Sequence, residues 1–509
     1  MRGTLLLTLI ICLFAVSVSY AGTNLFEPYT AFPTGSWPEA VAIGDVNGDG
    51  RNDVVLTTSF YFDPANDYHI HVFLQNASGA LNPPARYPTN STYSSGPSSV
   101  DIGDVNNDGR ADVVVGNSGS NIEVFLQNSY GSLDPGRSYL TVNSESIKIG
   151  DFNNDGLLDV AGIGWGTNQM DIFFQNESGI LTGPVTNEVT HGGYDEIEAG
   201  DVNNDGLEDI IVMSGQSYSY PNIGVLFQGP GGTFSLPVYY DLPGSELTHG
   251  VAIGDLDSDS LEDIVVTYGG NSPSSKIGVF YQNNTGALDP AFSYTSYDCP
   301  EPVEVADVNG DGKQDVIVAH GGWTELGIYL QGPDKDLISE ELYPIPYASH
   351  YNPQGLAVGD INGDGFNDVV IADYNNGLVV LYHNDLRFEE NEPSIYYKGT
   401  WLNYRCKACS GGAFAYSNET SANASFSFYG TGLKWIVTKN NNFGKAKVYL
   451  DGAYMGLVDL YSRLPKTQIS LQKTGLPAGN HTLHLEVSGQ KNPNSSGYYI
   501  NLDALEVIP

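Results

Sequence analysis

The chain has 509 residues, with 60 Asp and Glu against 21 Lys and Arg and a formal net charge of −39. Hydrophobic residues make up 41% of it, which is too many for a disordered acidic chain. The shortage of Lys and Arg argues against nucleic acid or anionic membranes as partners, because both are bound through dense positive charge. The acid is concentrated before residue 394 and the remainder has a small excess of basic residues, so we expect two domains.

Residues 1–21 have the features of a secretory signal peptide. Arg2 precedes an apolar stretch at residues 5–16, and Ser19 and Ala21 supply the small residues for cleavage after Ala21. The apolar run is too short to span a bilayer. We therefore expect an exported protein, secreted or at the cell surface, without a transmembrane anchor.

Seven repeats of four short strands follow. In each repeat an alternating strand leads into an acidic loop, and a β-branched strand and two further strands come after it. The loops recur at intervals of 47 to 59 residues, which is the period of a propeller blade. We predict an all-β fold, with a seven-bladed β-propeller over residues 22–390 followed by a jelly-roll-like β-sandwich over residues 391–509.

The last repeat shows only three clear strands, which end near His383. Residues 24–29 have the pattern of a strand and precede the first repeat. We expect this segment to complete the last blade and close the ring, because closure removes free sheet edges. The competing interpretation takes residues 386–390 as a local fourth strand.

Each acidic loop carries side-chain oxygens at positions 1, 3, 5 and 9, and six of the seven copies have glycine at position 6. Alternate oxygens on a tightly turning loop can converge on a hard cation such as Ca²⁺, and glycine allows the turn. An EF-hand would need glutamate at position 12, where these loops have strand residues instead. The candidate ligands are Asp45, Asn47, Asp49, Asp53, Asp104, Asn106, Asp108, Asp112, Asp151, Asn153, Asp155, Asp159, Asp201, Asn203, Asp205, Asp209, Asp255, Asp257, Asp259, Asp263, Asp307, Asn309, Asp311, Asp315, Asp360, Asn362, Asp364 and Asp368.

The pattern D-x-[DN]-x-D-G-x-x-D, repeated between two strands, resembles the FG-GAP/VCBS repeats of integrin α subunits and of many secreted proteins. The resemblance covers roughly residues 24–390 and implies one Ca²⁺ per blade, up to seven in all. The fifth copy departs from it with Asp257 at position 3 and Ser260 in place of glycine, so its occupancy is left open. We expect these ions to stabilise the blades rather than to signal or to catalyse.

The loops that lead into each first strand, and those that join the second and third strands, should lie on the face opposite the acidic loops. They carry many aromatic residues and histidines. Aromatic residues on the loops of a rigid scaffold suit contact with sugars or with a protein epitope, although each could instead pack between blades. The candidates on this face are Trp37, Trp165, Tyr268, His320 and Trp323.

Residues 391–509 have alternating strands and an Asp451-Gly452 turn, which indicates a β-sandwich. Segments 396–401, 426–435 and 479–507 resemble jelly-roll modules related to carbohydrate-binding and galactose-binding-like domains. Trp401 is either a sugar-stacking or a core residue, and Trp435 is expected in the core.

The cysteines indicate an oxidising compartment. Cys406 and Cys409 allow a redox pair, half of a metal site or a local disulfide, and the disulfide is favoured because no second pair accompanies them. Cys299 is then a lone thiol.

No sequence motif of a nucleophile elbow, a zincin or a P-loop is present, so no catalytic residue is predicted. The leading hypothesis is a secreted, calcium-binding adhesion or recognition protein whose ligand is an extracellular glycan or protein. The alternatives are a polysaccharide lyase or hydrolase with a sugar-binding module, and a structural surface or matrix component.

Overall fold

The computed structural model describes residues 25–58, 67–91, 96–119, 121–141, 144–164, 167–189, 194–214, 223–244, 247–332, 336–347, 354–384, 386–392, 394–477 and 479–508. Within these ranges every regular element is a β-strand, apart from the short 3-10 turn η1 (Ser410–Gly412). The same ranges contain no helix that is long and apolar enough to cross a membrane. The expected signal peptide lies outside them.

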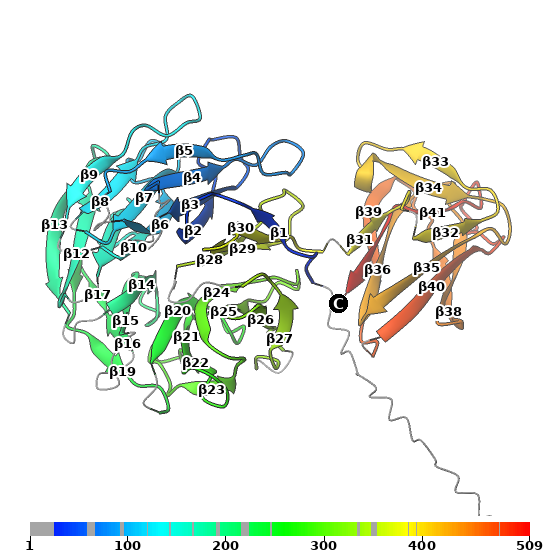
Figure 1. The fold of residues 1–509 in the computed structure, drawn as a ribbon. Coiled ribbons are helices and arrows are strands. Elements are labelled where there is room, and N and C mark those ends of the chain that lie inside the picture. Colours follow the sequence, from blue (N-terminus) through cyan, green and yellow to red (C-terminus); the bar gives the residue numbers. More distant parts are fainter. Residues whose placement is uncertain are drawn as a thin grey trace, which may run out of the picture.

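Seven four-stranded antiparallel sheets, here called blades 1 to 7, follow one another round an axis (Figure 1). Blade 1 has β2 (Pro38–Gly44), β3 (Asp53–Thr58), β4 (His69–Phe73) and β5 (Ala85–Pro88), and blade 2 has β6 (Pro97–Gly103), β7 (Asp112–Asn117), β8 (Asn121–Phe125) and β9 (Arg137–Leu140). Blade 3 has β10 (Ser146–Gly150), β11 (Asp159–Ile163), β12 (Gln169–Gln175) and β13 (Leu181–Glu188), and blade 4 has β14 (Tyr194–Gly200), β15 (Asp209–Ser214), β16 (Ile223–Leu226) and β19 (Val238–Tyr240). A small hairpin of β17 (Gln228–Gly229) and β18 (Thr233–Phe234) lies within the connection from β16 to β19.

The remaining blades complete the ring. Blade 5 has β20 (Thr248–Gly254), β21 (Asp263–Tyr268), β22 (Lys276–Phe280) and β23 (Phe292–Thr295), and blade 6 has β24 (Pro300–Ala306), β25 (Asp315–His320), β26 (Glu325–Tyr329) and β27 (Glu341–Pro344). Blade 7 has β28 (Leu356–Gly359), β29 (Asp368–Asp373), β30 (Gly377–Leu381) and β1 (Thr30–Phe32). Each first strand contacts that of the next blade, and β28 contacts β2, so the predicted β-propeller is confirmed.

The N-terminal segment supplies the outermost strand of blade 7, as expected. β1 pairs antiparallel with β30, with Thr30 opposite Val380, and Phe26 forms a bridge with His383. The regular strand therefore begins a few residues later than the predicted 24–29, while Leu25 and Phe26 are buried in the adjoining core. The competing interpretation is wrong, because β31 (Arg387–Glu389) pairs with a strand of the second unit.

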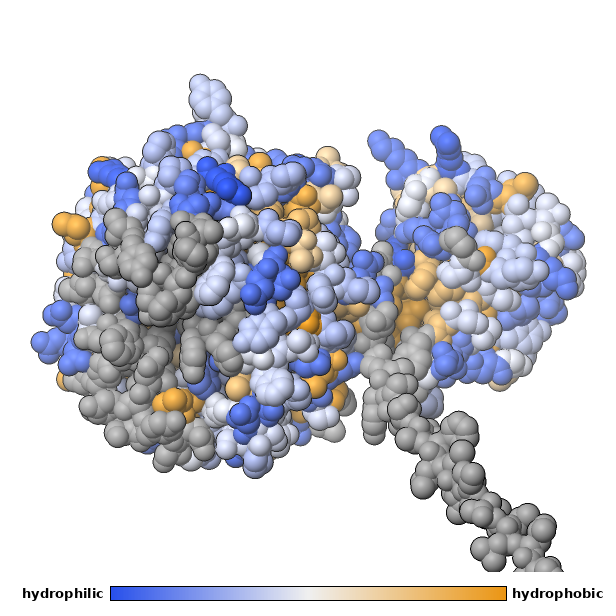
Figure 2. Space-filling model, viewed as in Figure 1, coloured by the Kyte–Doolittle hydropathy of each residue, from blue (hydrophilic) through white to orange (hydrophobic). Residues whose placement is uncertain are grey.

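The second strands of the blades explain how the core forms. In β7, Val113 and Val115 lie in the apolar cluster shared with blade 1, and Val114 lies in the cluster shared with blade 3. Successive side chains of a strand point to opposite faces, so a strand between two blades is buried on both sides and has a continuous β-branched run. Figure 2 shows a mainly hydrophilic surface with scattered hydrophobic patches.

The C-terminal unit is built from three antiparallel sheets around one apolar core that includes Trp435. One sheet comprises β31, β42 (Ala504–Ile508), β36 (Gly432–Lys439) and β39 (Lys466–Lys473). A second comprises β32 (Ile395–Lys398), β35 (Asn423–Gly430), β40 (Gly479–Val487), β37 (Lys445–Leu450) and β38 (Ala453–Asp459). A small third sheet has β33 (Leu402–Arg405), β34 (Ala413–Ser417) and β41 (Ile500–Leu502).

Candidate metal centres at the acidic loops

Each acidic loop joins the first and second strands of a blade, and the second copy illustrates its geometry. The carboxylate of Asp104 accepts hydrogen bonds from the backbone N of Asp108 (3.1 Å) and of Gly109 (2.8 Å). Gly109 has a φ of +79°, which glycine adopts without steric cost. The carboxylate at position 1 therefore holds the loop closed around itself.

The aspartate at position 9 lies at the start of the second strand and is fully buried. Asp112 Oδ1 accepts from the backbone N of Gln127 (2.8 Å), and its Oδ2 accepts from Asn106 Nδ2 (2.8 Å). The fourth copy has the same 2.8 Å contact between Asn203 and Asp209. The side chains of positions 3 and 9 therefore meet at one point in the loop.

The electrostatics at this point favour a cation. Burial, together with the carboxylates of Asp108 and Asp104, raises the pKa of Asp112 to about 7, against the hydrogen bond from Gln127. The pKa of the position 9 aspartate is raised in all seven copies. A divalent cation would offset both burial and repulsion and would favour the ionised form.

The donor atoms fit a hard cation. In the third copy, Asn153 Oδ1 is buried without a hydrogen-bond partner among the described residues, as expected of an oxygen that serves as a metal ligand. The side chains at the candidate positions are carboxylates and carboxamides without sulfur or imidazole, a set that suits Ca²⁺ better than zinc or copper. The loops could therefore hold Ca²⁺ through positions 1, 3, 5 and 9.

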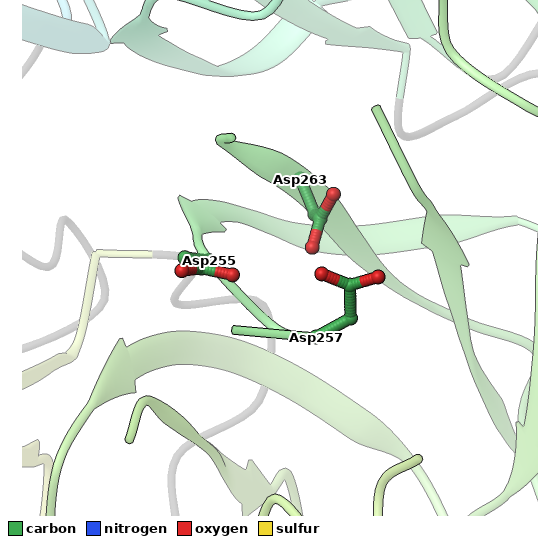
Figure 3. Close-up of side chains that lie close together, drawn as sticks. All are labelled: Asp255, Asp257 and Asp263. Atoms are coloured by element: carbon green, nitrogen blue, oxygen red, sulfur yellow. The ribbon is translucent and has the colours of Figure 1, made fainter. Parts of the chain in front are cut away.

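The fifth copy, whose occupancy the sequence left open, has the same loop geometry. Oxygens of Asp255, Asp257 and Asp263 all lie within 4.8 Å of one another, and Figure 3 shows the three side chains together. Ser260 takes a φ of +71°, and its N donates to Asp255 Oδ2 (2.9 Å), the bond that Gly109 makes to Asp104 in the second copy. Ser260 therefore replaces glycine without changing the turn.

Sequence reasoning missed the amide side chains that reach these loops from the neighbouring blade. A glutamine lies at the end of the third strand or just after it in six of the seven repeats, and histidine takes its place in the last. This recurrence in the sequence indicates that the position has a shared structural role in the blades. The pattern of a single chain segment does not show which loop of another blade such a side chain meets.

The aromatic candidates on the opposite face differ in exposure. Trp37 stacks on Tyr374 with ring centroids 5.4 Å apart, and Trp323 is 38% exposed with its ring edge-on to Tyr297. Both can take part in a surface. Trp165 lies outside the described residues.

Two candidates are interior residues, which corrects the expectation that they face a ligand. Tyr268 is 1% exposed and its hydroxyl lies 2.7 Å from Ser293 Oγ. His320 is fully buried, and its Nε2 lies 2.9 Å from Glu340 Oε1. Each residue ends the second strand of its blade. Tyr268 is covered by apolar residues of blade 4, and His320 by Glu340 and by Tyr297 and Asp298 in the segment that leads into blade 6.

In the C-terminal unit, Trp435 is a core residue, as expected, and Trp401 packs partly against the same core with its ring beside Tyr397. Trp401 is therefore not a free aromatic platform. Cys406 and Cys409 form a disulfide, and Cys299 is a free thiol.

Comparison with protein families identifies the repeats. A model described as FG-GAP-like repeat matches residues 60–115, 104–162, 151–212, 201–266, 258–318 and 307–371, and one described as FG-GAP repeat matches residues 37–73. The chain belongs to the FG-GAP repeat family. These matches cover most of the propeller, and every acidic loop lies inside at least one of them.

The FG-GAP chain also resembles curated proteins over part of its length. It is 28% identical over 215 residues to integrin alpha-8 of Homo sapiens, which covers 37% of this chain and 19% of that protein. It is 31% identical over 97 residues to the A type blood N-acetyl-alpha-D-galactosamine deacetylase of Flavonifractor plautii, covering 19% of this chain and 13% of that protein. The chain thus spans less than a fifth of either relative.

Among solved structures, the chain is similar to BBS1N in complex with ARL6DN. The similarity covers 71% of this chain and 97% of that chain, with 15% identity and a TM-score of 0.46. The chain is also similar to Raptor of Chaetomium thermophilum. This similarity covers 70% of this chain and 29% of that chain, with 11% identity and a TM-score of 0.45.

Proposed function

We propose that this protein is a calcium-stabilised FG-GAP propeller that works outside the cell as an adhesion or recognition protein. The observation that carries the calcium assignment is the convergence of carboxylate oxygens from Asp255, Asp257 and Asp263 in the fifth loop (Figure 3), whose acidic pattern recurs in the other six loops. Similarity to integrin alpha-8 and the signal-like N-terminus support an extracellular role. The ligand would be an extracellular protein or glycan.

Thermal unfolding in excess Ca²⁺ and in EDTA tests the calcium assignment. A site that only the folded chain forms adds about 2.7 kcal/mol when the free ion is at 100 times its dissociation constant, so EDTA should lower the midpoint by many degrees. A midpoint that is the same in both solutions would refute the assignment.

A titration by calorimetry tests the loops themselves. Asp205→Ala removes a position 5 carboxylate from the fourth loop and should lower the number of bound Ca²⁺ ions by one. Asp134→Ala removes an exposed aspartate outside the loops and is the matched control, which should keep the wild-type number. Equal stoichiometry in all three proteins would contradict the site.

A second function is a carbohydrate-directed enzyme. The observation that favours it is the similarity to the galactosamine deacetylase and to the A type blood alpha-D-galactosamine galactosaminidase of the same organism, 32% identical over 97 residues. Incubation with a panel of polysaccharides and blood-group glycans separates the two functions. Free amines left on the sugar with release of acetate, new reducing ends or new unsaturated ends would establish an enzyme, and retention on a glycan array without any product would support recognition alone.

A further inference from the structure

Every acidic loop is hydrogen-bonded to the blade that follows it. In five cases a glutamine Nε2 of the next blade donates to the carbonyl oxygen of the aspartate at position 1 of the loop. The pairs are Gln127 with Asp45 (3.1 Å), Gln175 with Asp104 (3.1 Å), Gln228 with Asp151 (3.2 Å), Gln282 with Asp201 (2.9 Å) and Gln331 with Asp255 (3.0 Å).

The other two loops receive the same bond from a different residue. Asn367 Nδ2 donates to Asp307 O, and Asn52 Nδ2 donates to Asp360 O, both at 3.0 Å. These asparagines occupy position 8 of their own loops. The bond from Asn52 joins blade 1 to blade 7, so all seven loops are held and the series runs round the closed ring.

In blade 1, Asn52 makes the bond to the preceding loop, and the glutamine of that blade is left without this contact. Gln75 occupies the same place after the third strand, yet neither Nε2 nor Oε1 of its buried amide has a hydrogen-bond partner in the described part of the chain. The contact to the position 1 carbonyl, rather than the glutamine, is thus what the seven junctions share. Gln75 is therefore a natural control for the others.

The acidic loop also packs against the next blade through apolar and backbone contacts. Val46, at position 2 of the first loop, is 1% exposed and lies in one apolar cluster with Val113 and Phe125 of blade 2. A Cβ on Gly131 of blade 2 would lie 2.7 Å from the carbonyl oxygen of Asn47, so only glycine fits there. The loop is therefore part of the junction between blades.

We infer that these amides are positioning residues for calcium. Through them, ion binding at each loop is coupled to the association of that blade with the next. The inference rests on the calcium role proposed above. Each amide fixes the backbone of the residue whose carboxylate closes the loop, so the ligand set is preorganised only while the next blade is docked. By linkage, a bound ion then stabilises that junction by the same factor.

The fourth loop offers the sharpest test, because two side chains of blade 5 hold Asp201. Gln282 Nε2 donates to its carbonyl, and Glu262 Oε2 accepts from its N (2.6 Å). A tryptophan at position 7, Leu207→Trp, reports binding at this loop through sensitised Tb³⁺ luminescence, and Ca²⁺ affinity follows from competition. In this background, Gln282→Leu removes the bond to Asp201 O and a second Nε2 bond to Glu262 O within blade 5 (3.1 Å). It should weaken Ca²⁺ at the fourth loop by about tenfold, since the bond to Asp201 is the one that reaches this loop.

The same variant should shrink the rise of the melting midpoint that Ca²⁺ produces. Gln75→Leu makes the same replacement at a site of equal burial and should leave both the loop affinity and the Ca²⁺-induced rise unchanged. Glu262→Ala is a second variant at a less buried position and should weaken binding at the loop in the same direction if Gln282→Leu does not fold.

Two results overturn the inference. One is an unchanged Ca²⁺ affinity at the fourth loop in Gln282→Leu, or in Glu262→Ala where only that variant folds. The other is a melting midpoint that the variant lowers equally in Ca²⁺ and in EDTA, as the loss of a hydrogen bond with no role in calcium binding would do. If the parent protein with Leu207→Trp binds neither Tb³⁺ nor Ca²⁺, the proposed function itself fails, whereas tight binding that is insensitive to the amide removes the coupling alone.

Discussion

Ser260 shows how a single residue can depart from the repeat and keep the loop. The glycine at this position has a φ between +79° and +90° in the other six copies, and a Cβ added there would meet nothing within 4 Å. Glycine is thus favoured for its backbone conformation and not for space. The cost of serine is the strain of a left-handed conformation alone.

We predict that Ser260→Gly stabilises the protein slightly. Relief of the left-handed strain, about 1 kcal/mol, is partly offset by the greater freedom of glycine in the unfolded chain, leaving a gain of about 0.5 kcal/mol. Gly206→Ala, at the same place in the fourth copy, should cost about 1 kcal/mol. Urea unfolding in excess Ca²⁺ measures both, and a loss of stability in Ser260→Gly would contradict the strain argument.

The N-terminal segment shows how one element decides whether the ring is closed. β1 completes blade 7 although it lies more than 300 residues from β30 in the sequence. Phe26 anchors the segment, since it is 3% exposed and its ring lies edge-on to Tyr343 at 5.3 Å between centroids. Closure of the ring therefore depends on burial of this segment as well as on strand pairing.

We predict that Phe26→Ala lowers the free energy of unfolding by about 3–5 kcal/mol, because it removes a buried aromatic ring and leaves a cavity. Tyr29→Ala, in the same segment at a side chain that is 42% exposed, should change it by less than about 0.5 kcal/mol. Denaturant unfolding of both variants gives the comparison. Similar small effects in the two would mean that the segment does not hold the ring.

Across the whole propeller, charged side chains of the first strands gather about the axis. Lys148 Nζ lies 2.7 Å from Glu198 Oε2, with Asp101 and Glu304 near this pair. Burial, with Glu198 and Asp101 adding to it and Lys148 opposing it, raises the pKa of Glu304 to about 8. One lysine thus faces several carboxylates in a partly buried place.

This arrangement makes stability depend on pH. The folded pKa of Glu304 is higher than that of an unfolded glutamate, so its contribution is fully present below about pH 4.5 and is lost as the pH rises through about 8. We predict that Glu304→Gln raises the melting midpoint at pH 8.5 by a few degrees relative to the wild type and has little effect at pH 5, in constant excess Ca²⁺. Glu177→Gln, at an exposed turn, is the control, and an equal shift at both pH values would contradict the prediction.

The sequence by itself determined what is local and repeated. The strand pattern, the seven acidic loops and the Cys406–Cys409 disulfide each depend on residues close together in the chain, and they follow from spacing and side-chain chemistry. For the fifth loop the sequence left the site open because of Ser260, and the structure showed that Ser260 N makes the bond that Gly109 makes in the second copy.

Only the tertiary structure decided what depends on residues distant in sequence. Tyr268 and His320 end strands, and their exposure is set by segments elsewhere in the chain, so the residue type could not show that they are buried. The amides of Gln282 and Asn52 find their carbonyl partners 81 and 308 residues away, across a junction between blades. The alternation of residues along a strand determines which side chains share a face of the sheet. The packing of the blades in the closed ring determines which residues those side chains contact.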